Sequence, residues 1–552
     1  MKRIIINSCK ILLVLLSLVG AIKMVFFGLL IDEEYAVVMS YRMVSGDEMF
    51  LNMWEPHQTS GFVCAIFIKL FLMILGSTEY LIVYLRIVGV LLQTAVSLFV
   101  YCTVRKMYDK EIAFWAGIMC FSLLPKWIQI PEFSNILLWS NLCTMMCFLR
   151  STRENAKKEV WLVLGAIFYC VAILAYPTCL VLIPIYLYGI YTSVPNMPKK
   201  HLCLFLGTCM TIGVAYILYF LFNLGAKEFL FGLRQMMTDG EHDYTFLQRL
   251  ATYGRELLNL LPTILLIIAV TIVLYAIIWC GVLKKKFCQE KLVFLLLLVF
   301  VAHVQQFFAW NSGQRYINEP LLFYYFTFGA GVVLAKKEDP LFIFGMLPAM
   351  GTIVAVLLIT NTTISVTGTN LLPGIIAGGI LVWEYVKEKK LAAGYKKYCV
   401  WMGIVTIGLL MFAKGCLICE NEGVKENIFY VKQKALSGPA KGIYCRYMDG
   451  YQYNILAEVT EKYISKEDVV LCVGYHCIRY MMTDGEISTY STISTPTYDE
   501  RLLEYWEIFP ERYPTIIIEE EGISHMKQVR EFLTLSDPIA EGDGFRIYRV
   551  IK

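Results

Sequence analysis

Long apolar segments alternate with short polar ones along the first 415 residues of the chain. An α-helix needs about 20 apolar residues to cross the hydrocarbon core of a bilayer. About thirteen segments reach or approach that length, so the pattern predicts a polytopic α-helical membrane protein with about 13 transmembrane helices. The predicted spans are 11–30, 80–104, 111–125, 133–149, 160–176, 178–193, 202–222, 256–283, 292–309, 320–335, 341–360, 371–386 and 399–415.

A further apolar segment, 61–76, is short and follows a polar stretch. It could either cross the membrane or lie at the interface as an amphipathic helix. The charges of the loops decide between the two, because cytoplasmic loops are enriched in Lys and Arg. If 61–76 does not cross, the inner loops carry 20 Lys and Arg and the outer loops eight. We therefore expect 61–76 on the outer surface, inside the outer loop 31–79, with a cytoplasmic N-terminus.

The composition changes near residue 416. Overall, 58% of the residues are apolar and 17% are charged, which excludes an ordinary cytosolic enzyme. The net charge of +4 is too small to indicate a nucleic-acid partner. Residues 421–552 hold 36 charged side chains in 132 positions, whereas residues 1–420 hold 58. We predict a membrane domain, 1–415, and a small soluble extracytoplasmic α/β domain, 416–552.

The C-terminal domain alternates short β-rich runs with helical ones, which is typical of a small α/β sheet. It contains no GxGxxG after its first strand, and the chain has no phosphate-binding P-loop, so no nucleotide is assigned. The expected strands are 442–445, 468–473, 486–491, 515–518 and 544–550, and the expected helices are 453–463, 498–509 and 524–533, with a helical turn before 483.

Cysteine and acidic clusters do not predict a metal site. The chain has 18 Cys, most of them in apolar runs where Cys acts as a small hydrophobe. Cys416 and Cys419 have CxxC spacing, but no second pair or His cluster completes a zinc site. The acidic cluster 239–243 contains oxygen ligands without a fixed spacing, which favours a solvated flap.

Three carboxylates, Asp32, Glu33 and Glu34, follow the first predicted span. A solvated helix end explains them by position alone. The same outer loop also carries Glu55 and His57, and Arg86 opens the next span. Carboxylates, an imidazole and a guanidinium at one membrane face suit a substrate that is part lipid and part polar headgroup, because cations bind phosphate and apolar walls hold lipid.

These features, in this order, resemble the membrane glycosyltransferases of the GT-C fold, and most closely the protein O-mannosyltransferases and the lipid A aminoarabinose transferases. The resemblance covers roughly residues 1–200 and extends loosely to an Arg-Tyr pair near a later span. The chain lacks the Pro-Pro that follows the His in the family, and a Glu stands where the second outer loop usually has an Asp. The matching features are Asp32 and Glu33, the Ser-Gly-Asp at 45–47, Glu55 and His57, segment 61–76, Arg86, the basic turn 105–110, Glu132, Arg315 and Tyr316.

The resemblance implies that a sugar is transferred, with inversion, from a polyprenyl-phosphate donor to an acceptor glycan, glycolipid or protein at the outer face. It implies Asp32 as the general base, with Glu33 and Glu132 beside it to position acceptor or sugar. Arg86 and Arg315 are candidates to bind the phosphate, although an interfacial Arg that reaches lipid headgroups is an equal alternative. The expected substrate-binding residues are Glu55, His57, Arg86, Glu132, Arg315 and Tyr316.

A transporter or flippase of a lipid-linked or polar substrate is the main alternative. Transporters usually place charged or helix-breaking residues at the membrane midplane and show repeated halves. In this chain the candidate residues cluster at one face and no internal repeat is evident, which favours a transferase. The loop charges and composition suggest a bacterial plasma membrane. The sequence leaves open the sugar, the acceptor, the role of the C-terminal domain and whether a divalent metal joins the carboxylates.

Overall fold

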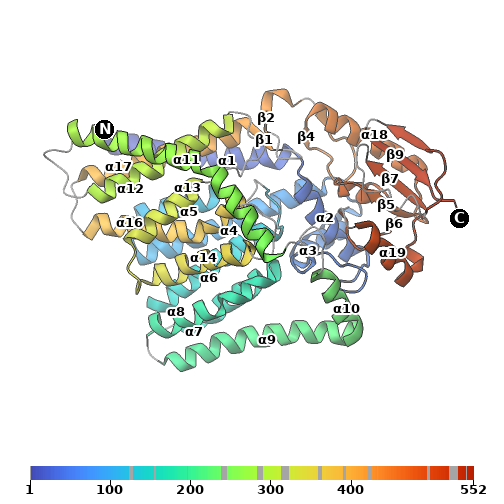
Figure 1. Cartoon of the computed structure of the whole chain (residues 1–552), viewed down its shortest axis with the longest axis horizontal. Helices are drawn as coiled ribbons and strands as arrows, with labels where there is room; N and C mark the ends of the chain where they lie inside the picture. The colour runs from blue at the N-terminus through green and yellow to red at the C-terminus, as the bar shows by residue number, and fades with distance from the viewer. Residues whose placement is uncertain are drawn as a thin grey trace.

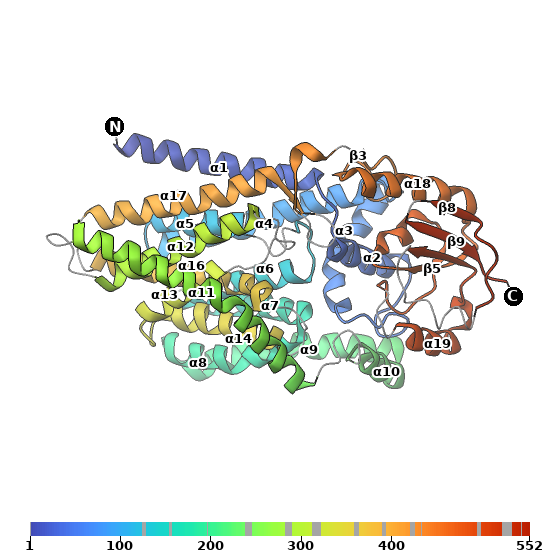
Figure 2. The ribbon, with the colours of Figure 1, turned by 45° about the horizontal axis from the view of Figure 1, so that its top comes forward.

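In the computed structural model the chain forms a long bundle of helices joined to a small α/β domain (Figure 1). The N-terminus lies at the end of the bundle far from that domain, and the C-terminus lies on the domain itself (Figures 1 and 2). The residues described are 2–123, 128–153, 157–195, 197–237, 245–281, 290–311, 322–357, 364–388, 393–419, 425–431, 433–493, 498–520, 533–542 and 544–551.

Every one of the predicted spans overlaps a helix of the bundle. Local hydropathy specifies these helices, because a buried or lipid-exposed backbone must satisfy its own hydrogen bonds. The bundle helices are α1 (Lys2–Phe26), α4 (Leu81–Met107), α5 (Lys110–Ser122), α6 (Phe133–Arg153), α7 (Lys158–Ala175), α8 (Ile183–Ser193) after a 3-10 segment (Pro177–Leu182), α9 (Pro198–Leu224), α11 (Phe246–Gly281), α12 (Glu290–Asn311), α13 (Leu322–Leu334), α14 (Leu347–Leu357), α16 (Leu372–Glu388) and α17 (Ala393–Cys416).

The protein is a mostly helical membrane protein. Within the described residues, six helices are long and apolar enough to cross a bilayer, and six further apolar segments are shorter. The six long ones include α3 (Gln58–Leu75), which corresponds to segment 61–76. That all thirteen predicted segments cross the membrane stays a prediction.

Helix α3 runs across the end of the bundle that faces the C-terminal domain. At its start, His57 stacks on Phe133, the first residue of α6, with 4.1 Å between ring centroids. Near its end, Phe71 packs against Tyr84 in the first turn of α4, with 4.8 Å between centroids. The starts of α4 and α6 both face the C-terminal domain: the Ile82 amide donates to a carbonyl of that domain, and Phe133 belongs to the apolar cluster that includes the sheet.

Two of the predicted inner loops meet at the opposite end of the bundle. Asp109 caps the start of α5 by accepting from the amides of Glu111 and Ile112 (2.9 and 3.1 Å). Its other carboxylate oxygen accepts from the Trp383 indole near the end of α16 (2.7 Å), and the Lys387 ammonium lies 3.8 Å away. The loop 105–110 and the beginning of loop 387–397 are therefore neighbours.

The C-terminal domain is built on a five-stranded mixed sheet with the strand order β6-β5-β7-β9-β8. Strand β5 pairs in parallel with β6 and β7, and β9 pairs antiparallel with β7 and β8. Two short hairpins, β1-β2 and β3-β4, precede the sheet. The elements are β1 (Leu417–Cys419), β2 (Lys425–Asn427), β3 (Gln433–Lys434), β4 (Tyr444–Cys445), α18 (Tyr447–Tyr463), β5 (Val469–Val473), β6 (Glu486–Ile487), α19 (Tyr498–Ile508), β7 (Ile516–Glu520), β8 (Ala540–Gly542) and β9 (Phe545–Arg549).

Both faces of this sheet are covered, because alternate residues of a strand point to opposite faces. Leu471 and Ile517 pack with α19 and with Trp54 of the outer loop. Val470 and Ile518 belong to a cluster that also contains residues of α18, α3 and α2 (Ile31–Ser45). Helix α2 consequently lies between the bundle and the sheet (Figure 2).

The sequence analysis missed two helices and the short strands β1, β2, β3 and β8, and it predicted the strand at 486–491 too long. Residues 31–79 were expected as a loop that contains one interfacial helix, but α2 precedes it, and α10 (Ala226–Met237) follows α9. The strand expected at 486–491 ends at Ile487, after which the chain turns toward the outer loop. The helix expected at 524–533 and the acidic cluster 239–243 lie outside the described residues.

A close backbone contact at Gly89 of α4 gives a test of the packing. A Cβ atom at Gly89 would lie 1.5 Å from the Gln129 carbonyl oxygen, whereas one at Gly207 of α9 would meet nothing within 4 Å. We expect Gly89→Ala to destabilise the protein by about 3 kcal/mol through overpacking. Gly207→Ala should leave stability unchanged or raise it by about 0.5–1 kcal/mol, because Ala is the better helix former. Thermal unfolding in detergent checks both, and equal Tm values for the two variants would contradict the packing.

Candidate functional site

The acidic residues Asp32, Glu33 and Glu34 form the first turn of α2. Carboxylates are stabilised there because the amino end of a helix carries partial positive charge. Glu33 and Glu34 are almost fully buried, at 1% and 0% exposed, whereas Asp32 is half-buried. The three side chains therefore have different surroundings although they are consecutive in sequence.

Glu33 pairs with Arg86 of α4. Arg86 Nε and Nη2 donate to the two oxygens of the Glu33 carboxylate, at 2.7 and 2.5 Å. The guanidinium also donates to carbonyls at the carboxyl end of α1, those of Met24 and Val25 and, beyond them, that of Gly28 (2.7 Å). Arg86 thus fixes the start of α2 to the end of α1, and its expected part in phosphate binding stays a prediction.

Glu34 contacts the C-terminal domain. Its carboxylate lies 3.3 Å from His476 Nδ1 and accepts from the Ile478 amide at 3.4 Å. Glu520 and Arg479 complete this charged group, since Glu520 lies 3.8 Å from His476 Nε2 and 3.5 Å from Arg479 Nη2. Burial alone lowers the pKa of His476, but the carboxylates of Glu34 and Glu520 outweigh burial and raise it above its ordinary value.

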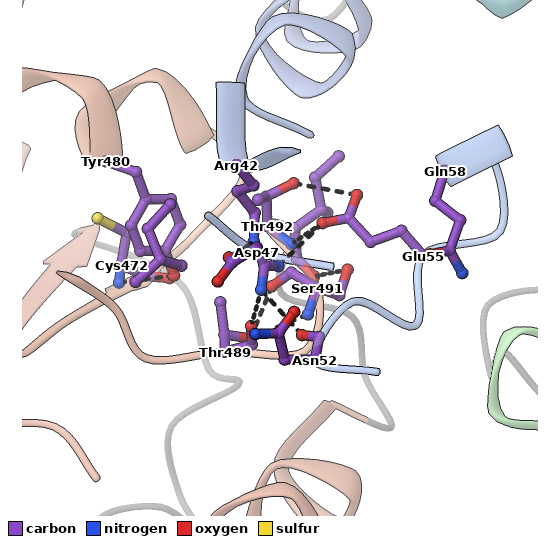
Figure 3. Close-up of polar contacts among 12 residues, drawn as sticks. Arg42, Asp47, Asn52, Glu55, Gln58, Cys472, Tyr480, Thr489, Ser491 and Thr492 are labelled. Atoms are coloured by element: carbon purple, nitrogen blue, oxygen red, sulfur yellow. Dashed lines mark hydrogen bonds and ion pairs between the residues drawn. The ribbon is translucent and has the colours of Figure 1, made fainter. Parts of the chain in front are cut away.

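The other end of α2 carries a fully buried arginine, Arg42 (Figure 3). Its Nε donates to Asp47 at 2.6 Å, and its Nη1 lies 3.3 Å from Glu55. Its Nη2 donates to the carbonyls of Asn52 (3.0 Å) and Thr489 (2.7 Å), the latter in the C-terminal domain. The two carboxylates raise the pKa of Arg42 against the opposing effect of burial. We call Arg42, Asp47, Glu55 and their Thr489 and Thr492 partners the Arg42 cluster.

The carboxylates of the Arg42 cluster also bind the C-terminal domain directly. Glu55 accepts from the Thr492 amide (3.0 Å) and lies 3.4 Å from the Thr492 hydroxyl. Asp47 accepts from Arg512 Nη2 at 2.9 Å. Burial raises the pKa of Glu55, and the attraction of Arg42 and the Thr492 amide only partly offset that rise. Glu55, expected near the donor headgroup, is therefore a contact between the outer loop and the C-terminal domain.

Tyr176, which follows the last residue of α7, interacts with three of the candidate residues. The His57 ring packs edge-on against the Tyr176 ring, with 5.3 Å between centroids. The carboxylates of Glu132 and Asp32 interact electrostatically with the buried Tyr176 hydroxyl. Asp32, His57 and Glu132, which the sequence analysis took from separate segments, thus each interact with Tyr176.

Glu132 also has a structural role. Its carboxylate accepts from the Ser134 and Asn135 amides at 2.8 and 2.7 Å, and its carbonyl accepts from the Ile136 amide. These bonds make Glu132 the N-cap of α6, where a carboxylate satisfies amides that have no partner within the helix. Its expected part in positioning the substrate stays a prediction.

Sequence reasoning missed Arg42 and Tyr176, together with the partners in the C-terminal domain. Arg315 and Tyr316 lie outside the described residues. Among the residues that the structure does describe, no group of three or more His, Cys, Asp or Glu side chains is arranged to hold a metal ion. A carboxylate such as that of Asp32 can accept a proton, and the aromatic and acidic side chains that interact with Tyr176 can bind a polar ligand.

The comparisons with known proteins give structural neighbours only. No protein-family model and no curated protein sequence matches the chain. The structure of ArnT from Cupriavidus metallidurans bound to undecaprenyl phosphate is similar, with a TM-score of 0.47 and 12% identity over 98% of this chain and 97% of that one. The archaeal oligosaccharyltransferase AglB from Archaeoglobus fulgidus, in complex with an inhibitory peptide and a dolichol-phosphate, also has a TM-score of 0.47 and 12% identity, over 96% of this chain and 71% of that one. These neighbours are GT-C glycosyltransferases.

The Arg42 cluster predicts how the C-terminal domain is held. Arg42→Met leaves Asp47 and Glu55 buried without their shared cation, which should cost about 3–5 kcal/mol. We expect a lowered Tm and faster proteolytic release of the C-terminal domain. The exposed Arg105→Met at the opposite end of the bundle is the matched control. Arg42→Met with Glu55→Gln should recover part of the loss, because the amide carries no charge, and wild-type protease resistance of Arg42→Met would contradict the prediction.

The His476 group predicts a pH dependence. Because its pKa in the folded protein is raised, protonated His476 stabilises the interface with Glu34 fully below its ordinary pKa of about 6.5. That contribution is lost as the pH rises through the raised value. The difference in Tm between the wild type and His476→Gln should therefore be largest in acid and should shrink as the pH rises. A difference that grows with pH would show that His476 does not act through its charge.

Proposed function

We propose that the protein transfers a sugar from a polyprenyl-phosphate donor to an acceptor at the outer face of the membrane, with inversion. The observation that carries the proposal is the different burial of the three carboxylates in the first turn of α2. Glu33 and Glu34 are buried against Arg86 and the C-terminal domain, whereas Asp32 is half-buried and interacts electrostatically with the Tyr176 hydroxyl, as Glu132 does.

In this proposal Asp32 is the general base. Its carboxylate accepts the proton of the acceptor hydroxyl while the acceptor oxygen forms a bond to the anomeric carbon. The bond from that carbon to the phosphate oxygen breaks on the opposite side, and polyprenyl phosphate leaves with the electron pair. No protein nucleophile is needed, because the configuration inverts in one displacement and phosphate is a competent leaving group when cations meet its charge.

The remaining candidates have assigned parts. Glu33 positions Asp32, since its ion pair with Arg86 fixes the first turn of α2 to the end of α1. His57 and Glu132, which like Asp32 interact with Tyr176, would contact the sugar or the acceptor. Arg315 and Tyr316 remain our candidates for the leaving phosphate on the resemblance alone, and Glu55 acts through the Arg42 cluster.

The proposal predicts that Asp32→Asn loses turnover while it keeps the fold. Removal of a general base typically costs about 10²–10⁴-fold in rate. The assay is release of polyprenyl phosphate by purified protein from a panel of polyprenyl-phosphate sugars, with crude membranes as the source of acceptor. Glu458→Gln, which changes an exposed carboxylate on α18, is the matched control and should keep wild-type turnover.

Two results would overturn the proposal. Equal turnover of the wild type and Asp32→Asn would remove Asp32 as the base. Absence of turnover from every donor in the panel would favour the alternative function, transport of a lipid-linked or polar substrate.

A further inference from the structure

A cavity of about 640 Å³ lies between the end of α2, one side of α3 and the last turns of α9. Polar groups from three segments line it: Asp47 and Glu48 after α2, Lys69 on α3, and Asn223 on α9. Phe62 and Tyr219 form part of its apolar wall. The volume lies within the range of about 300–1,000 Å³ that is usual for small-molecule sites.

This cavity is separate from the neighbourhood of Asp32. Helix α2 has 15 residues, with Asp32 at its start and Gly46 directly after its end. At 1.5 Å per residue, the two ends of α2 lie about 21 Å apart. A molecule in the cavity would therefore contact the far end of α2 and not the proposed reaction centre.

The surface around the cavity is continuous with the lipid-facing surface of the bundle. One side of α3 exposes a helical stripe, with Phe62 53%, Ile66 47% and Met73 75% exposed. On α9, an apolar helix long enough to cross the membrane, Phe222 is 84% exposed. Large apolar side chains this exposed at the outer end of a membrane helix lie against lipid, so a lipid of the outer leaflet is the molecule that can reach the cavity.

The charged residues that line the cavity indicate which lipid headgroup fits it. Lys69 is an exposed cation next to the apolar stripe and complements a phosphate. The charge of Asp47 is met by Arg42 and Arg512, but Glu48 presents an exposed carboxylate to the same cavity. A headgroup that carries both a phosphate and an N–H donor can pair with Lys69 and with Glu48. We propose that this cavity binds a membrane phospholipid whose headgroup carries a phosphate and a primary ammonium group, with the phosphate on Lys69 and the ammonium on Glu48.

The bound lipid would connect α9 to the turn after α2, which also carries Asp47 of the Arg42 cluster. It contacts three segments that are distant in sequence, and its acyl chains would cover the exposed stripe of α3. The proposal does not depend on sugar transfer, since binding can be measured without turnover.

The test is native mass spectrometry of delipidated protein titrated with dioleoyl phosphatidylethanolamine. Dioleoyl phosphatidylcholine, which lacks the N–H donors, and dioleoylglycerol, which lacks the phosphate, are the matched lipids. We expect one molecule of the ethanolamine lipid to bind in preference to both. Lys69→Gln should weaken its binding about fivefold, as the loss of about 1 kcal/mol implies. Glu48→Gln should remove the preference over the choline lipid.

Lys110→Gln, an exposed lysine at the start of α5 on the opposite end of the bundle, is the control and should bind as the wild type does. Both cavity residues are exposed, so each variant should keep its Tm; if one does not, Asn223→Ala tests the same wall from α9. Equal binding of the three lipids, or wild-type binding by Lys69→Gln and Asn223→Ala, would overturn the proposal.

Discussion

The buried guanidinium of Arg42 is the interaction on which the arrangement of the two domains depends. A charge in an apolar interior is tolerated only when hydrogen bonds and opposite charges replace its water. Arg42 obtains these partners from Asp47 and Glu55 of the outer loop and from the Thr489 carbonyl of the C-terminal domain. The bundle and the sheet domain therefore satisfy one another's polar groups, and α2 is held between them at both ends.

The helix ends next to the site follow the same rule. Arg86 donates to carbonyls at the end of α1, Lys23 donates to those of Lys414 and Leu417 at the end of α17, and Lys414 donates to that of Ser122 at the end of α5. Each of these carboxyl ends carries partial negative charge and lacks donors within its own helix. A Lys or Arg side chain from a neighbouring helix supplies them, so the carboxyl ends of α1, α5 and α17 are linked to one another next to the first turn of α2.

The sequence predicts the bundle well because hydropathy is a local property. The apolar segments appear as helices, and the strands β5, β7 and β9 lie close to their expected positions. Helix α2 was not predicted because four charged residues interrupt its apolar ones. These charged residues can be buried only through distant partners. Arg86 is 53 residues away from Glu33, and His476 is 442 residues away from Glu34. Pairing at such separations is a property of the fold and cannot be read from spacing.

The proposal assigns proton transfer to Asp32, which is half-buried, and not to its almost fully buried neighbours Glu33 and Glu34. A general base must come within hydrogen-bond reach of the substrate proton that it accepts. The buried Glu33 carboxylate pairs with Arg86. The buried Glu34 carboxylate contacts His476 and the Ile478 amide. Their ion pairs fix the helix turn and offset two of its three negative charges. The C-terminal domain therefore contributes to the site by holding α2, even though the residues proposed for the chemistry belong to the bundle and its outer loop.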